Sequence, residues 1–223
     1  MITSEQAGRL IDISAVRTAH TLSDVEKLVE YAREYKFINV HTLPCWTGIL
    51  AEMLKSVPDV YVGAPVGFPS GGHRTEVKLE EARLLLADGV QEMDIVMNVG
   101  RFMNKEYDFV LSELRQIIDI TPEDVLTKVI IEINVLSDNE MERACELVID
   151  SGADFVKTGT GWVSGDANIK RIKKIKKICG SRIKVKAAGG IRKPQEFIEL
   201  CDMGVERMGI NTKSAIKIVE HFR

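Results

Sequence analysis

Residues 127–161 read TKVIIEINVLSDNEMERACELVIDSGADFVKTGTG, and this stretch decides the fold. It begins with a short β-branched run, continues through a segment with the apolar spacing of a helix, and ends in a second short run at residues 155–157. Ser137-Asp138 with Glu140 is a helix start signal, and Gly152 is a typical C-terminal cap. The stretch therefore predicts a strand–helix–strand unit of the kind found in parallel sheets.

The same alternation recurs along the chain, and eight such units can be counted. Further helix signals are Ser23-Asp24 as a start and Gly89, Gly180 and Gly204 as C-terminal caps. Strands are expected at Leu10–Ile13, Phe37–His41, Val60–Val66, Glu92–Met97, Thr127–Ile133, Phe155–Lys157, Ile183–Ala187 and Arg207–Ile210, with the helices between them.

Eight units without a ninth strand favour an α/β fold of the (β/α)8 TIM barrel class, because closure leaves no edge strand unpaired. Lys128, Lys157 and Lys186 lie 29 residues apart in succession (157 − 128 and 186 − 157), about one unit each. No linker or change in composition divides the chain, so residues 1–223 are expected to form a single domain. An open doubly wound sheet is the alternative.

Composition excludes several classes of function. Hydrophobic residues make up 45% and the net charge is −3, which lacks the basic excess of a nucleic-acid-binding protein. We see no signal peptide and no 18-residue apolar run, so a cytoplasmic protein without membrane contact is expected. The four cysteines lack metal-ligand spacing, and the segment IKRIKKIKKIC at residues 169–179 is expected to be a barrel helix with a solvated basic face.

Two lysines mark the candidate active site, since a barrel presents its reacting groups at the carboxyl ends of its strands. Lys157 ends the run GADFV, and Lys186 lies in IKVKAAGG on the next strand. Burial and repulsion between the two cations both favour a neutral amine, the form that attacks a carbonyl carbon. The pair predicts Schiff-base chemistry on an aldehyde; lysines that merely extend to solvent are the alternative.

Asp94 interrupts the apolar run EMDIVM, where an unpaired carboxylate would be costly to bury. A cationic partner is therefore expected, either in a structural ion pair with Lys128 or Lys186 or in a proton shuttle at the imine carbon. Lys128 and Glu132 share parity on one predicted strand, so a supporting salt-bridge network is expected for them, with no catalytic role for Glu132.

Histidines are given no catalytic role. His41 closes the second strand and is expected to line the pocket as a hydrogen-bonded structural residue. His20, His73 and His221 are expected on the surface.

Two glycine-containing segments near the end of the chain suit a phosphate group. Gly189-Gly190-Ile191-Arg192 follows the seventh strand, and Gly209 with Asn211-Thr212 precedes the last helix. Backbone N–H groups and the N-terminal end of a helix bind a dianion well. Turns that need glycine for positive φ are the alternative.

Across nearly the whole chain these motifs resemble the deoxyribose-phosphate aldolases, class I aldolases on a TIM barrel. The segment GADFVKTGTG is similar to the family's Schiff-base motif, which ends KTSTG, and this places the nucleophile on Lys157. IKVKAAGGIR resembles the second-lysine motif and implies that Lys186 lowers the pKa of the nucleophile. EMDIVMNVG resembles the strand with the proton-relay aspartate, which is Asp94 here.

The resemblance also implies the substrate-binding residues. LIDIS at residues 10–14 resembles the family's LIDHT and points to Asp12 and Ser14 as pocket residues. The residues that would surround the substrate phosphate are Gly161, Gly189, Gly190, Arg192 and Gly209. The expected set is Asp12, Ser14, His41, Thr160, Gly161, Gly189, Gly190, Arg192, Gly209, Asn211 and Thr212.

Several positions depart from the family pattern. Gly159 replaces the serine of KTSTG, His41 replaces a frequent cysteine, and Trp162 replaces a residue that is often Phe or Lys. Asn211 and Thr212 stand where the family usually has two serines. The catalytic positions match, whereas the substrate-facing positions differ.

By resemblance, the reaction is the reversible cleavage of 2-deoxyribose 5-phosphate to glyceraldehyde 3-phosphate and acetaldehyde. No metal or organic cofactor is expected, because the protonated imine serves as the electron sink. The expected partners are a small-molecule sugar phosphate and an aldehyde, with a homo-oligomer left open and no nucleic acid or membrane. Alternatives are a Schiff-base lyase for another phosphorylated sugar or aldehyde, and a non-catalytic phosphosugar-binding barrel.

Overall fold

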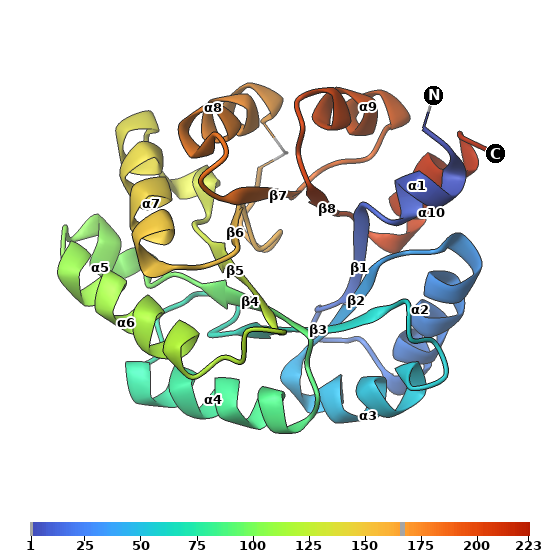
Figure 1. The fold of residues 1–223 in the computed structure, drawn as a ribbon, viewed down its shortest axis with the longest axis horizontal. Helices are drawn as coiled ribbons and strands as arrows, with labels where there is room; N and C mark the ends of the chain where they lie inside the picture. The colour runs from blue at the N-terminus through green and yellow to red at the C-terminus, as the bar shows by residue number, and fades with distance from the viewer. Residues whose placement is uncertain (1, 166–167) are drawn as a thin grey trace.

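Eight parallel strands form a closed barrel in this computed structural model, which describes residues 2–165 and 168–223 (Figure 1). The strands pair in chain order, and β8 pairs with β1 to close the ring. The predicted TIM barrel is confirmed. The strands are β1 Ile11–Ala15, β2 Asn39–Thr42, β3 Tyr61–Val66, β4 Glu92–Val96, β5 Leu126–Ile130, β6 Phe155–Lys157, β7 Lys184–Ala188 and β8 Arg207–Gly209.

The helices form a ring around the barrel, and the two chain ends lie close together where the first helix packs beside the last (Figure 1). Among the described residues no helix has the length and apolar character to cross a bilayer. The helices are α1 Ser4–Gly8, α2 Leu22–Tyr35, α3 Pro44–Leu54, α4 Thr75–Ala87, α5 Val99–Met103, α6 Tyr107–Asp119, η1 Ile133–Val135 (a 3-10 turn), α7 Asp138–Ser151, α8 Ile169–Cys179, α9 Pro194–Asp202 and α10 Thr212–Glu220.

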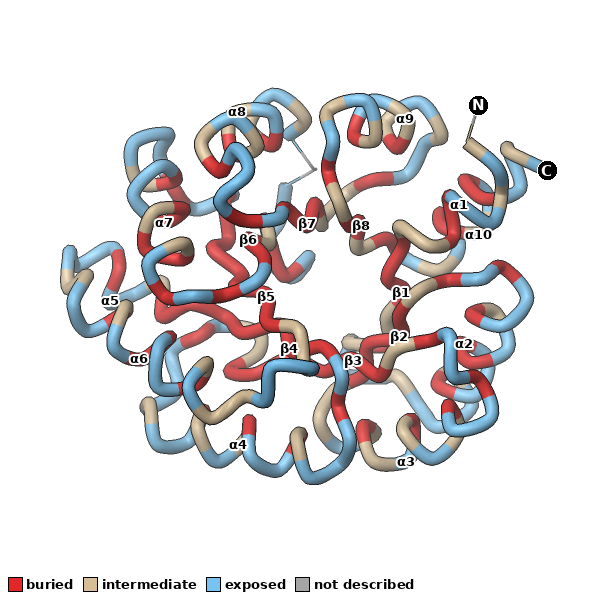
Figure 2. Tube along the Cα trace, in the orientation of Figure 1, coloured by how far each residue is buried: buried red, intermediate tan, exposed pale blue. Residues whose placement is uncertain are grey.

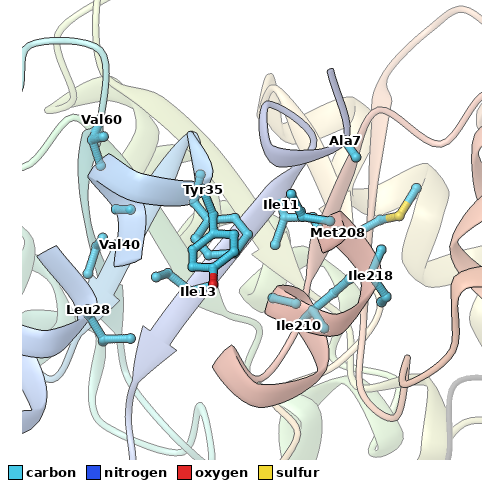
Figure 3. Packing of buried hydrophobic residues seen from close by; sticks show 14 of the residues in the cluster. Ala7, Ile11, Ile13, Leu28, Tyr35, Val40, Val60, Met208, Ile210 and Ile218 are labelled. Atoms are coloured by element: carbon cyan, nitrogen blue, oxygen red, sulfur yellow. The ribbon is translucent and has the colours of Figure 1, made fainter. Parts of the chain in front are cut away.

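The apolar core lies between the strands and the surrounding helices. Figure 2 shows buried residues along the strands and on the inner faces of the helices, with exposed residues outside. Figure 3 shows part of this layer, where Ile11 and Ile13 of β1 pack among side chains of the neighbouring strands and helices. On α8, Ile172 and Ile175 are buried, so the lysine-rich segment is a barrel helix as predicted.

The interior of the barrel is polar and charged. Such interiors are more commonly filled by branched apolar side chains. Buried ionic groups need partners, so this interior must be a network of ion pairs. Its buried charged side chains are Asp12, Glu92, Asp94, Lys128, Lys186 and Arg207.

Two predicted boundaries are wrong. Strand β5 ends at Ile130 and not Ile133, because Glu132 adopts a left-handed backbone (φ 53°) and the 3-10 turn η1 follows. Helix α2 begins at Leu22 rather than at Ser23-Asp24, because Thr21 is the cap and its N–H and hydroxyl donate to the carboxylate of Asp24. The other strands agree with the prediction to within two residues at each end.

The predicted C-terminal caps are confirmed. Gly152 and Gly180 are the caps of α7 and α8, both with positive φ. Gly89 and Gly204 follow the caps of α4 and α9, with φ of 88° and 73°.

Candidate active site

Strand register brings the two predicted lysines together. Lys157 at the end of β6 is the direct partner of Lys186 in β7. The next residue, Thr158, ties the two strands further: its hydroxyl donates to the carbonyl of Ala188 at 2.9 Å and accepts from the Ala188 N–H at 2.8 Å. Strand pairing therefore holds the backbone at both lysines and fixes the positions of their Cα atoms.

Lys157 combines burial with a single close anion. Its side chain is 11% exposed, and Nζ lies 2.6 Å from Oδ2 of Asp94 on β4. The pKa of Lys157 is lowered to about 8: burial lowers it most, the charge of Lys186 lowers it as well, and Asp94 opposes both by raising it. The predicted repulsion between the lysines is thus present but smaller than the effect of burial. At pH 7 about a tenth of this amine is then neutral, far more than for an ordinary lysine.

Lys186 stays protonated. Its Nζ lies 2.5 Å from Oδ2 of Asp12 and 2.8 Å from Oδ2 of Asp94. Burial alone would lower the pKa of Lys186, but these two carboxylates outweigh burial and raise it. Lys186 is consequently a fixed cation beside Lys157.

The balance of charge in the barrel interior indicates which lysine can lose its proton. Three buried carboxylates, those of Asp12, Glu92 and Asp94, face four basic side chains in one connected cluster. The basic members are Lys128, Lys157, Lys186 and Arg207. Among the described residues Lys157 ion-pairs with Asp94 alone, whereas Lys186 pairs with two carboxylates. Unbalanced buried charge is costly, so one of the four basic groups is expected to lose its proton. Lys157 has fewer carboxylate partners than Lys186, and its deprotonation leaves three positive and three negative charges.

Asp94 is the centre of this cluster. Burial would raise the pKa of Asp94, but His41, Lys157 and Lys186 together hold it well below its usual range. Its Oδ2 faces all three of these groups, with Nε2 of His41 at 3.1 Å. The expected cationic partner of Asp94 is therefore present, and an ionised carboxylate lies within hydrogen-bond distance of the Lys157 amine.

Glu132 does not join the predicted salt-bridge network with Lys128. Lys128 instead pairs with Glu92 at 2.5 Å. Glu132 accepts hydrogen bonds from the N–H of Thr160 at 3.1 Å and from its hydroxyl, in the loop after β6. The parity argument fails because the strand has ended before Glu132 and the backbone there is left-handed.

A cavity of about 390 Å³ opens above these groups at the carboxyl ends of the strands. All fourteen residues predicted for the site lie on its wall, and their individual roles remain predictions. They are Asp12, Ser14, His41, Asp94, Lys157, Thr160, Gly161, Lys186, Gly189, Gly190, Arg192, Gly209, Asn211 and Thr212.

Nine further residues line the cavity, and three of them, Arg17, His20 and Phe68, carry large side chains that the sequence did not indicate for the site. His20 was expected in a surface loop; it is half-buried in the loop after β1, where its Nδ1 accepts the N–H of Arg17, and it also lines the cavity. Arg17 and His20 follow β1 within a few residues. Their position in a βα loop was the signal that could have found them.

Known proteins are similar to this chain over most of its length. A deoxyribose-phosphate aldolase of Sinorhizobium medicae is 43% identical over 211 residues, 94% of this chain and 84% of that protein. The deoxyribose-phosphate aldolase of Klebsiella pneumoniae is 38% identical over 219 residues, 97% of this chain and 88% of that protein. No family model matches the chain. The chain belongs to the deoxyribose-phosphate aldolase family.

Solved structures of aldolases agree with this assignment. The aldolase QR15 has a TM-score of 0.91 and 35% identity, covering all of this chain and 96% of its own. The deoxyribose-phosphate aldolase of Aeropyrum pernix, described as a tetramer, has a TM-score of 0.90 and 27% identity, covering all of this chain and 93% of its own. The predicted family, fold class and enzyme class, an aldehyde-lyase, are confirmed.

Within this aldolase, Asn211 has a task that the sequence did not reveal. It is the N-cap of α10: its Oδ1 accepts the N–H of Ser214 at 3.0 Å, and its Nδ2 donates to the Ser214 hydroxyl at 3.0 Å. The polar side chain of Asn211 is therefore engaged in the helix cap. At position 211, what the chain can offer an anion is therefore its backbone and not its side chain.

The glycines near the end of this aldolase chain are consistent with both interpretations of them, a phosphate site and turns that need positive φ. Gly189 and Gly190 have φ of 98° and 84°, which glycine adopts freely, and they lie on the cavity wall. Gly209 is needed for space, because a Cβ there would lie 3.2 Å from Cβ of Ala188 and 3.5 Å from Cε of Lys186.

Trp162 of this aldolase packs against Arg17, a residue of the cavity wall. Its Nε1 donates to the carbonyl of Val16 at 3.1 Å, and the guanidinium of Arg17 lies over its ring, 5.4 Å from the centroid. Arg17 also donates to the carbonyl of Gly161 at 2.6 Å. The loops after β1 and β6 are thus joined across the cavity, with a cation at the junction.

Proposed function

We propose that the protein cleaves 2-deoxyribose 5-phosphate reversibly into acetaldehyde and glyceraldehyde 3-phosphate, with Lys157 as the Schiff-base nucleophile. The observation that carries the proposal is the state of Lys157. It is a buried amine with a lowered pKa, it faces a cavity, and it lies 2.6 Å from an ionised carboxylate. Those are the properties that amine catalysis of carbonyl chemistry requires.

Imine formation is the first stage. The neutral amine of Lys157 adds to the C1 carbonyl of the open-chain sugar and gives a carbinolamine. Its hydroxyl leaves as water after it gains a proton, and the C1–N double bond of the imine forms. Asp94, with Lys186 as the neighbouring proton donor, lies where these protons must move.

Carbon–carbon cleavage is the second stage. The protonated imine withdraws the electron pair of the C2–C3 bond while a base removes the proton of the C3 hydroxyl, and C3 becomes the aldehyde carbon of glyceraldehyde 3-phosphate. The enamine left on Lys157 gains a proton at C2, and water releases acetaldehyde. The imine nitrogen is the electron sink, so the proposed chemistry needs no metal or organic cofactor.

The phosphate is assigned to the side of the cavity that holds Gly189, Gly190, Arg192 and the N-terminal end of α10. Backbone N–H groups at a helix start favour anions, and the partial positive charge of the helix adds to this. Arg192 supplies a cationic side chain on the same wall. The aldehyde end of the sugar then points towards Lys157.

Borohydride reduction in the presence of acetaldehyde tests the nucleophile. The expected result is a stable ethyl adduct on the peptide that contains Lys157, found by mass mapping of the folded protein. A Lys157→Met variant is the matched control and should give none. If the folded wild type forms no adduct on Lys157, the proposed function is wrong.

A second candidate is a Schiff-base aldolase for another phosphorylated sugar or aldehyde. The observation that favours it is the capping role of Asn211, which leaves that side chain engaged within α10. Cleavage assays with 2-deoxyribose 5-phosphate, ribose 5-phosphate and unphosphorylated 2-deoxyribose separate the two. A higher kcat/KM for a sugar other than 2-deoxyribose 5-phosphate would favour this second candidate.

Assembly and location are further parts of the proposal. We infer a homo-oligomer, supported by the Aeropyrum pernix relative, which is described as a tetramer. Light scattering on the protein as it elutes from a size-exclusion column measures its mass in solution. A monomer at micromolar concentration would contradict the inferred homo-oligomer. A cytoplasmic location stays a prediction from the sequence.

A further inference from the structure

A buried polar pair on β2 lies against the central carboxylate and has no part in the steps above. His41 is 4% exposed and Asn39 is fully buried. Nε2 of His41 lies 3.1 Å from Oδ2 of Asp94, and Nδ1 of His41 is in hydrogen-bond contact with the side-chain amide of Asn39, whose Oδ1 faces it. The imidazole thus connects an amide on one side to the catalytic carboxylate on the other.

Space for this imidazole comes from a glycine on the next strand. Gly63 of β3 is the register partner of His41. A Cβ at position 63 would lie 2.4 Å from both Cε1 and Nδ1 of His41, and 2.7 Å from Oδ1 of Asn39. A side chain cannot occupy that space together with the imidazole. Residues from three adjacent strands therefore build the place that His41 occupies.

The protonation of His41 follows from its surroundings. Burial lowers the pKa of His41 to about 4, so near neutral pH the ring carries one N–H. Asp94 is ionised, and a bare Nε2 at 3.1 Å from its Oδ2 would place two acceptors against each other. The N–H therefore belongs on Nε2, and Nδ1 must accept a hydrogen bond.

Asn39 can supply that hydrogen bond. With Oδ1 turned to the ring, both Nδ2 of Asn39 and Nε2 of His41 are buried without a hydrogen-bond partner among the described residues. A half-turn of the amide exchanges its oxygen and its NH2 group, which have nearly the same size. The NH2 group then donates to Nδ1 of His41, and the Nε2–H of His41 donates to Asp94.

We propose that His41 is a positioning residue: held by Asn39, it donates from Nε2 to Oδ2 of Asp94 and so sets how strongly Asp94 binds the ammonium of Lys157. This inference rests on the proposed function of Lys157. The same oxygen already faces Lys157 and Lys186, so a third donor draws charge away from the ion pair with Lys157. A weaker ion pair releases the neutral amine at lower pH.

Other charged groups also act on this site and must stay unchanged in any test. Lys128 of β5 and Lys186 of β7 both lower the pKa of His41, while Asp94 raises it. Variants at His41 leave all of these groups in place. The charged side chains that face the Asp94 site are Asp12 from β1, Lys128 from β5, Lys157 from β6 and Lys186 from β7.

The test compares His41→Met with His41→Gln by borohydride trapping of acetaldehyde on Lys157 across pH. Met removes the donor to Asp94, and the pH of half-maximal trapping should rise by about half a unit or more. Gln offers an NH2 group at similar reach, so the pH of half-maximal trapping in His41→Gln should stay closer to that of the wild type. For cleavage, kcat should fall in the Met variant with little change in KM. Equal pH profiles for the wild type and the Met variant would overturn the proposal.

A second measurement is made on the wild-type protein, and a variant serves only to assign the signal. Nitrogen NMR of the folded wild type with 15N-labelled histidine reads the tautomer of each of the 4 histidines, and His41→Gln assigns the signal. The expected state at pH 7 is a neutral ring with the proton on Nε2. A proton on Nδ1, or on both nitrogens, would overturn the proposal.

The two hypotheses fail in different ways. If the wild type forms no adduct on Lys157, the proposed function fails, and the role of His41 fails with it. If the wild type forms the adduct and the Met variant keeps the same pH profile, only the role of His41 is lost. Gly63→Ala adds an arm that leaves His41 unchanged in sequence, and it should shift the profile in the same direction as His41→Met by displacing the imidazole.

Discussion

Lys157 and Lys186, register partners on adjacent strands, converge on one oxygen: their Nζ atoms lie 2.6 and 2.8 Å from Oδ2 of Asp94. Their electrostatic states differ all the same. The pKa of Lys157 is lowered, chiefly by burial, whereas the pKa of Lys186 is raised by its two carboxylates. One strand pair thus holds a reactive amine next to a lysine that is protonated at rest.

The pH dependence of imine formation follows from the pKa of Lys157, which is about 8. The reactive form is the neutral amine, so trapping of acetaldehyde by borohydride should rise with pH through about 8 and level off above it. A lysine with an ordinary pKa would reach half-maximal trapping more than two units higher, near 10.4. A midpoint near that ordinary value in the folded protein would contradict the lowered pKa.

Replacing Lys186 by Leu should move this midpoint upward. The charge of Lys186 lowers the pKa of Lys157, and its removal also frees Asp94 to bind Lys157 more tightly. We expect a shift of about one pH unit. Lys186→Arg keeps the charge and is the matched control, so a shift of similar size in both variants would point to lost geometry and not to lost charge.

Stability depends on a second buried ion pair, between α4 and α6. Nζ of Lys78 lies 2.6 Å from Oε1 of Glu113 and donates to the carbonyl of Val96, at the end of β4, at 3.0 Å. Both side chains are at most 1% exposed. Lys78→Met leaves the carboxylate buried without its cation, with only the Thr75 hydroxyl still donating to it, and should lower the free energy of unfolding by about 3 to 5 kcal/mol.

Urea unfolding followed by circular dichroism measures this loss. The double variant Lys78→Met with Glu113→Leu removes both charges and should recover most of the stability, because an apolar pair of similar volume needs no ionic partner. Lys55→Met breaks an exposed pair with Glu52 and should change the stability by less than about 1 kcal/mol. A single variant at Lys78 that costs no more than the exposed control would disprove the assignment.

The sequence predicts the barrel and its lysines well because both depend on local periodicity. Lys157 and Lys186 recur at the interval of one βα unit, and the pairing of β6 with β7 then brings them together. What the sequence missed comes from backbone that leaves the pattern: the left-handed Glu132 ends β5 early, and the irregular loop after β1 brings Arg17 and His20 to the cavity wall. Spacing along one strand also could not show that Lys186 reaches Asp12 across the barrel.

Arg17, at the mouth of the cavity, should contribute to the recognition of a phosphorylated substrate. Its guanidinium is exposed, lies over Trp162 and lines the cavity, so it adds positive charge where a dianion enters. For Arg17→Ala we expect a rise in KM of about fivefold for 2-deoxyribose 5-phosphate, equivalent to about 1 kcal/mol for an exposed charge pair, with kcat little changed. Unphosphorylated 2-deoxyribose should respond much less, and the difference should shrink at high salt as the charges are screened. Arg17→Lys keeps the charge, and its KM for 2-deoxyribose 5-phosphate should lie between those of the wild type and the alanine variant. If the alanine variant raised KM equally for both sugars, Arg17 would shape the cavity mouth through its packing on Trp162, and its charge would have no part in phosphate recognition.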